Sequence, residues 1–163
     1  MIFPVSAMST STLESFKVET SDGVKLQTRV FKPKDEARQN LVVVLVHPYS
    51  IMGGCQGLLR GIACGIAESG YRAVTFDMRG AGKSSGRASL TGFAEIKDVV
   101  AVCKWVCENL SVHRILLVGS SAGMLFLSFF CEILISDWLS GLVIALGYDC
   151  SYILIQILFK IMF

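Results

Sequence analysis

Residues 115–123 read ILLVGSSAG, and this stretch decides the fold. Its first four residues are apolar and bulky, which is typical of a strand buried on both faces of a parallel sheet. Gly119, Ser121 and Gly123 then fit the pattern G-x-S-x-G. Glycines at the edges of a sharp turn leave room for its backbone, so the serine hydroxyl is lifted above the sheet. The pattern predicts that Ser121 is a nucleophile and that the backbone N–H of Ala122 faces a developing oxyanion.

Strands and helices alternate before this stretch. Buried strands are predicted at residues 41–46 and 71–76, and amphipathic helices at residues 53–69 and 93–110. Because strand–helix–strand units form parallel sheets through right-handed crossovers, the chain is predicted to be an α/β protein. Residues 16–31 alternate between apolar and polar side chains around a Ser-Asp-Gly turn, which predicts a β-hairpin ahead of the parallel strands.

Glycine recurs at every fourth position of the first predicted helix, as Gly57, Gly61 and Gly65. Glycine in a helix interior is unfavourable relative to alanine by roughly 0.5–1 kcal/mol. A helix face without side chains can approach a sheet closely, so we expect these three positions to pack on the sheet.

Two further motifs follow the predicted strands. His47-Pro48-Tyr49 comes directly after residues 41–46, and a Gly53-Gly54 pair follows it. Residues 77–84, directly after the next strand, read DMRGAGKS. Together with the G-x-S-x-G turn, these motifs resemble the α/β-hydrolase superfamily of the serine hydrolase type, in which that turn is the nucleophile elbow. The resemblance covers about residues 16–123.

The resemblance implies an incomplete α/β-hydrolase fold, with an N-terminal β-hairpin followed by a mostly parallel sheet and flanking helices. It also implies that the N–H of Tyr49 is the second oxyanion-hole donor, beside that of Ala122. The structural residues of the site would be His47, Asp77, Arg79, Gly119 and Gly123. The implied reaction is hydrolysis of an ester, thioester or amide in a small-molecule acyl substrate, without a cofactor.

The loop at residues 77–84 also comes close to a phosphate-binding motif. Gly82-Lys83-Ser84 fits the end of G-x-x-x-x-G-K-[ST], but the first position of that motif is here Asp77. A carboxylate at this position would repel the phosphate that such a loop cradles. We therefore do not expect nucleotide binding.

A histidine that would activate Ser121 is missing after it in the sequence. In this fold the triad runs Ser, then Asp or Glu, then His, but the two histidines, His47 and His113, both precede Ser121. His113 lies at the start of the elbow strand, about 20 Å from the serine by the rise of a strand. His47 is the better-placed alternative base, because its strand neighbours the elbow strand in the family.

The carboxylates after Ser121 do not complete a triad either. The downstream carboxylates are Asp137 and Asp149. Asp149 follows residues 141–147, which resemble the family's next strand, but it comes one strand early and is interpreted as a turn or solvated aspartate. The sequence therefore predicts a serine hydrolase by ancestry with impaired or no activity in this chain. The alternative is a non-catalytic truncated isoform or binding module of the same fold.

We expect a single partial α/β-hydrolase domain over residues 1–163, with residues 1–15 disordered and residues 124–163 forming a divergent apolar tail. The tail holds four charged side chains, and the longest charge-free run, residues 115–131, has 17 residues. A membrane-spanning helix needs about 20. A membrane or protein partner for this tail stays open as a third hypothesis.

Composition limits the partners and the compartment. The formal net charge of +2 is too small to predict nucleic-acid binding. The six cysteines form no C-x-x-C pair and the chain has two histidines, so we expect no metal site and interpret the cysteines as buried thiols. Reduced cysteines and an N-terminus without a secretory signal pattern predict a cytoplasmic protein.

Overall fold

One sheet is the framework of the molecule. The computed structural model describes residues 12–34, 41–48, 54–112, 114–120 and 142–146. Within these ranges, six strands form a sheet in the order β1-β2-β4-β3-β5-β6. The strands are β1 Thr12–Glu19, β2 Lys25–Lys32, β3 Leu41–Val46, β4 Arg72–Phe76, β5 Arg114–Ser120 and β6 Leu142–Leu146. The helices are the 3₁₀ helix η2 Gln56–Leu59 and the α-helices α1 Arg60–Glu68 and α2 Phe93–Asn109.

The sheet combines an antiparallel and a parallel part. β1 and β2 form an antiparallel hairpin, and β2 also pairs antiparallel with β4. β3 pairs in parallel with both β4 and β5, and β5 pairs in parallel with β6. The predicted fold class, with a hairpin before a mostly parallel sheet, is confirmed.

The hairpin begins earlier in the chain than predicted. The sequence suggests disorder over residues 1–15, but residues 12–15 belong to β1, where Thr12 pairs with Lys32. The Nζ of Lys32 also lies 2.6 Å from a carboxylate oxygen of Glu14. Local composition does not reveal this pairing, because the backbone partners come from β2. Residues 1–11 lie outside the described residues.

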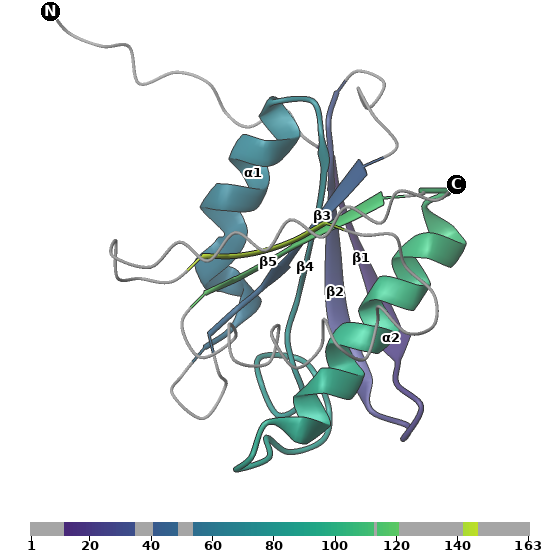
Figure 1. Ribbon diagram of the computed structural model, residues 1–163, viewed down its shortest axis with the longest axis vertical. Helices are drawn as coiled ribbons and strands as arrows, with labels where there is room; N and C mark the ends of the chain where they lie inside the picture. The colour runs from purple at the N-terminus through teal and green to yellow at the C-terminus, as the bar shows by residue number, and fades with distance from the viewer. Residues whose placement is uncertain (1–11, 35–40, 49–53, 113, 121–141, 147–163) are drawn as a thin grey trace, which may run out of the picture.

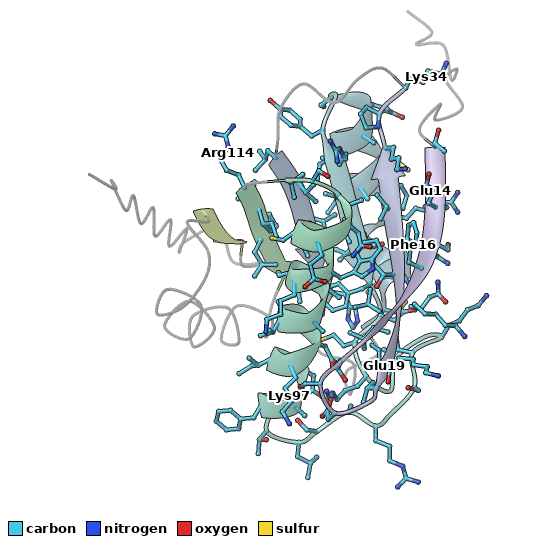
Figure 2. The ribbon with its side chains drawn as sticks, turned by 90° about the vertical axis from the view of Figure 1, so that its right-hand side faces the viewer. Glu14, Phe16, Glu19, Lys34, Lys97 and Arg114 are labelled. Carbon is cyan, nitrogen blue, oxygen red and sulfur yellow. The ribbon has the colours of Figure 1, made fainter. Side chains whose placement is uncertain are left out.

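Two helices cover opposite faces of the sheet (Figure 1). On one face, α2 packs a stripe of buried side chains against the strands: Ile96, Val99, Val102, Cys103 and Val106. Figure 2 views the molecule from this side, where Phe16 of β1 packs against Trp105 of α2 with ring centroids 4.8 Å apart. The cover provided by α2 therefore extends to the hairpin.

The central strand β3 contributes to both hydrophobic cores. Val44 and its neighbours two residues away pack in the core under α2, while Val43 and Leu45 pack in the core under α1. Burying one such side chain contributes roughly 1.5–3 kcal/mol to stability. A strand covered on both faces needs apolar residues at successive positions, which explains the uninterrupted run at residues 41–46.

The three glycines of the first predicted helix do not pack on the sheet, so that expectation is wrong. Gly57, Gly61 and Gly65 are exposed, and a Cβ built at either of the last two meets no heavy atom within 4 Å. Ala63 and Ala67, which are 0% and 1% exposed, take the place against the sheet. Close approach of α1 therefore depends on alanines, and the glycines lie on its outer side.

Gly65→Ala is expected to raise the free energy of unfolding by about 0.5–1 kcal/mol, because alanine has the higher helix propensity and its methyl group meets open space. Denaturant titration measures the change. Gly82→Ala is the matched control and should lose stability, because Gly82 has a φ of +52° and a Cβ there would overlap the Asp77 carboxylate. A loss of stability in Gly65→Ala would contradict the assignment of this face as free of packing.

Candidate active site

The carboxyl ends of β3 and β5 meet at one edge of the sheet. The two strands pair in parallel with Val46 opposite Gly119. Neighbouring strands lie about 4.8 Å apart, so the segments that follow these two residues begin side by side. The strand order also changes direction here, because β3 leads to β4 on one side and β5 leads to β6 on the other. Open α/β sheets bind ligands at such switch points.

Part of the predicted site lies within the described residues. Gly119 is a buried residue of β5. His47, at the end of β3, and Asp77 and Arg79, after β4, are also buried. Outside the described residues lie Ser121, Ala122, Gly123 and Tyr49, together with His113, Asp137 and Asp149. The roles assigned to these residues remain predictions.

Both ring nitrogens of His47 are engaged in hydrogen bonds. The backbone N–H of Met78 donates to Nε2 at 3.0 Å, so Nε2 carries no proton. Nδ1 carries the proton of the neutral ring and donates to the carbonyl of Pro48, 2.5 Å away. Burial lowers the pKa of His47, which favours this neutral form. The alternative that His47 is the base for a serine is therefore wrong, because neither nitrogen is free to take a proton.

Asp77 holds the loop that follows β4. Its carboxylate accepts hydrogen bonds from the backbone N–H and the side-chain amide of Gln56, at 2.9 and 2.8 Å, and from the N–H of Lys83 at 3.2 Å. A Cβ at Gly82 would overlap this carboxylate. The loop is folded around the Asp77 carboxylate. The backbone N–H of Lys83, which a phosphate-binding loop would offer to the phosphate, already donates to this carboxylate. This geometry argues against nucleotide binding, as the sequence did.

Two serines attach the same loop to the hairpin. The Oγ of Ser84 donates to the carbonyl of Asp77 at 2.6 Å and accepts from the N–H of Gln27 at 2.8 Å. The Oγ of Ser85 accepts from the N–H of Lys25 at 2.8 Å. These bonds continue the pairing of β2 beyond the end of β4, so β2 fixes the position of the loop.

Arg79 lies between two carboxylates and joins three parts of the molecule. Asp98 of α2 accepts hydrogen bonds from the N–H, Nε and Nη2 of Arg79 at 2.8, 3.0 and 2.7 Å. Asp22, in the hairpin turn, accepts from Nη1 and Nη2 at 3.0 and 3.2 Å. Burial raises the pKa of Asp98, although Arg79 opposes the shift. The hydrogen bonds from Arg79 hold the pKa of Asp22 well below its usual range.

Gln56 and Asp98 carry much of this network but were not singled out from the sequence. Gln56 also accepts from the hydroxyl of Thr75 at 3.0 Å and donates to the carbonyl of Gln27 at 3.1 Å. Both side chains are almost fully buried. For Asp98 the sequence contains a signal. This residue stands four positions before Val102, so it places a polar side chain on the apolar face of the predicted helix.

The sheet order and the loop after β4 are those of an α/β-hydrolase fold, and solved structures agree. An α/β serine hydrolase homologue from Coxiella burnetii has a TM-score of 0.64 and 25% identity over 85% of this chain and 64% of that chain. An α/β serine hydrolase without lid from Xanthomonas campestris has a TM-score of 0.65 and 26% identity over 83% and 60%. A Pyrococcus furiosus esterase has a TM-score of 0.60 and 26% identity over 72% and 44%.

The model of the family described as X-Pro dipeptidyl-peptidase (S15 family) matches residues 22–152, and the chain belongs to this family of serine hydrolases. A curated relative is an uncharacterized 31.7 kDa protein in the traX-finO intergenic region of Escherichia coli, 31% identical over 106 residues. That match covers 63% of this chain and 35% of the relative. The chain thus spans about a third of the length of this relative.

The stability of the protein is expected to fall as the pH drops below about 6.5, where an unfolded histidine titrates. The folded pKa of His47 lies lower, so between the two values the unfolded chain binds more protons. The slope should stay below about 1.4 kcal/mol per pH unit, which is the limit for one proton. Denaturant titrations of the wild type and of His47→Gln at several pH values measure the effect. The difference between the two slopes removes the contributions of other titrating groups. Equal slopes in both proteins would contradict this prediction.

Asp98→Ala is expected to lower the free energy of unfolding by about 3–5 kcal/mol, because it leaves the buried Arg79 without its fully buried partner. Asp22→Ala is the matched comparison. The Asp22 side chain is 33% exposed, so its loss should cost about 1 kcal/mol or less. Urea titration of both variants measures the difference, and losses of equal size would argue against Asp98 as the principal partner.

Proposed function

We propose that this chain carries the acyl-binding half of a serine hydrolase site. Ser121 is the nucleophile, and the N–H groups of Ala122 and Tyr49 hold the oxyanion of the tetrahedral intermediate. The observation that supports this best is the pairing of Val46 with Gly119, because Tyr49 and Ser121 follow those residues closely in the chain. The substrate is a small-molecule ester, thioester or amide.

The chemistry common to these substrates is attack on a carbonyl carbon. The Ser121 oxygen forms a bond to that carbon, the carbonyl oxygen becomes the oxyanion, and the serine proton passes to a base. The family description names a peptidase and one structural neighbour is called an esterase. Both descriptions involve this attack, and they leave the acyl and leaving groups of the substrate open.

Turnover by these 163 residues depends on a base that takes the proton of Ser121. The sequence has no histidine after Ser121, and both nitrogens of His47 are engaged. Without a base the serine is a weak nucleophile, and only oxyanion-hole and binding effects remain, worth about 10³–10⁴-fold over water. We therefore propose impaired or absent turnover for this polypeptide. The same observation favours the second candidate function, a non-catalytic binding module of this fold.

The cytoplasm is the compartment that we propose. Four cysteines in the described residues, Cys55, Cys64, Cys103 and Cys107, are free thiols. Burial raises the pKa of Cys103 to about 12, so this thiol is unreactive.

A membrane partner receives no support from the helices in the described ranges, none of which is long and apolar enough to cross a bilayer. Residues 142–146 of the apolar tail form the strand β6.

A fluorophosphonate probe tests the nucleophile. We expect slow labelling of the purified chain at Ser121, which Ser121→Ala abolishes and the neighbouring control Ser120→Ala retains. Peptide mass spectrometry identifies the labelled residue, and circular dichroism checks that each variant is folded.

The possible outcomes separate the two candidate functions. Labelling that persists in Ser121→Ala would contradict Ser121 as the nucleophile. A folded chain that takes up no label favours the binding module. Rapid ester turnover by the purified chain would overturn the proposal of impaired activity.

A further inference from the structure

Two large apolar side chains are exposed to solvent where α2 begins. Leu90 is 91% exposed and Phe93 is 63% exposed. They lie at the end of the loop between β4 and α2, at the lower end of the molecule in Figure 1. Leu90 therefore contributes almost nothing to the two hydrophobic cores. Exposed apolar side chains that are grouped at one place mark an interaction surface.

The turn that carries these side chains is held by polar contacts. The N–H and the hydroxyl of Ser89 donate to the Glu95 carboxylate at 2.7 and 2.6 Å, and the Ser89 Oγ accepts from the N–H of Gly92 at 2.9 Å. The Glu95 side chain is buried, so the turn is attached to the interior of the molecule. Leu90 and Phe93 thus project from a fixed backbone, which lowers the entropic cost of binding a partner.

The exposed charges near this turn are basic. Between residues 77 and 97, the exposed charged side chains are Lys83, Arg87 and Lys97. The acidic side chains of the same stretch, Asp77 and Glu95, are buried and accept hydrogen bonds. Figure 2 shows Lys97 on α2 near the end where this helix begins. The surface of the loop therefore offers positive charge to a partner.

The neighbouring hairpin removes only part of this charge. Asp22 lies 3.0 Å from Nη1 of Arg79 and 3.6 Å from Nζ of Lys97, so Lys97 is partly neutralised. None of the ion pairs between described residues involves Lys83 or Arg87. These two cations belong to one compact loop, because the N–H of Gly80 donates to the carbonyl of Ser85 at 3.0 Å.

We propose that the loop between β4 and α2 docks on an anionic phospholipid surface. Leu90 and Phe93 insert among the lipid chains, and Lys83 and Arg87 lie against the headgroups. Leucine or phenylalanine beside basic residues is the pattern of proteins that lie on such a membrane without crossing it. A side chain as exposed as Leu90 projects from the surface. A folded partner would need a pocket to receive it, whereas fluid lipid accommodates a side chain of any shape.

This inference goes beyond the proposed function and does not depend on a reactive Ser121. It also agrees with the proposed compartment, because the cytoplasmic leaflet of membranes carries anionic lipids. The docking loop lies within the described residues and is separate from the apolar tail at residues 124–163.

Sedimentation of the purified chain with lipid vesicles tests the apolar contacts. We expect binding to vesicles of phosphatidylcholine and phosphatidylserine in equal amounts. The double variant Leu90→Ser/Phe93→Ser should lower the partition coefficient by at least about tenfold, because both inserted side chains are lost. The matched control is Leu13→Ser/Ile62→Ser, which removes two other exposed apolar side chains, on β1 and α1. It should bind like the wild type, and an equal loss in the control would overturn the inference.

Vesicles of phosphatidylcholine alone test the charges. The wild type should bind them more weakly, and Lys83→Gln/Arg87→Gln should lower binding to the mixed vesicles by about 20- to 30-fold, since each basic residue near an anionic surface contributes about fivefold. Lys17→Gln/Lys104→Gln is the control, because these exposed lysines lie on β1 and in the second half of α2. Equal binding of the wild type to both kinds of vesicle would contradict the role of the cations.

Fluorescence gives a second readout, of insertion itself. The emission of Leu90→Trp should shift to shorter wavelength with mixed vesicles and be quenched by brominated lipid, whereas Ile62→Trp should respond no more than the wild type. A wild type that binds neither kind of vesicle overturns the inference. So does a dimer in light scattering that Leu90→Ser/Phe93→Ser abolishes, since the loop would then contact a second copy of the chain. Binding losses that follow the melting temperatures of the variants would also overturn it.

Discussion

The parallel pairing of β3 with β5 is the constraint on which the site depends. It places Val46 opposite Gly119, and both strands end at the point where the strand order changes direction. A shift of one residue in this pairing would turn every side chain of one strand to the other face, so side chains that pack under α1 would meet α2 instead, and the reverse. The two helices on opposite faces hold that register, because each covers one set of the alternating β3 side chains.

Polar contacts, rather than apolar packing, hold the loop after β4 at this edge. The buried groups His47, Gln56, Asp77, Arg79 and Asp98 all have hydrogen-bond partners. Among the described residues, the hydroxyl of Thr28 is the buried side-chain group without a partner. A buried polar group left unsatisfied costs about 1–3 kcal/mol, so each bond excludes alternative loop conformations. The proposed oxyanion site needs such well-defined surroundings, because its donors must be in place before the charge develops.

Much of the fold could be predicted from the sequence, because hydrophobic periodicity carries local information. The apolar run at residues 41–46 matches β3 and the stripe from Phe93 onward matches α2. For the first helix, the sequence predicts one apolar stripe of Leu58, Leu59, Ile62, Ala63, Ile66 and Ala67, and this stripe is wider than the buried face of η2 and α1. Leu59, Ala63 and Ala67 are buried, whereas Leu58 and Ile62 are 63% and 56% exposed. A short helix pattern does not show which edge of the stripe faces the sheet.

The candidate site was predictable only in part. Its motifs follow strand ends and are visible in the sequence, so the loops after β3, β4 and β5 could be expected to meet. The partners of those motifs come from distant segments: Gln56 is 21 residues from Asp77, and Asp98 is 19 residues from Arg79. The local sequence around a polar residue does not indicate which distant group will be its hydrogen-bond partner in the folded protein. The same limit applies to residues 12–15, whose place in β1 depends on β2.

A crystal structure of this chain that includes residues 119–123 is the most direct measurement of the central claim. We predict a sharp turn directly after β5, with the Ser121 hydroxyl and the N–H groups of Ala122 and Tyr49 around one position, each about 3 Å from it. A Ser121 within an uninterrupted helix or strand, or directed into the core beneath α1 or α2, would contradict the account.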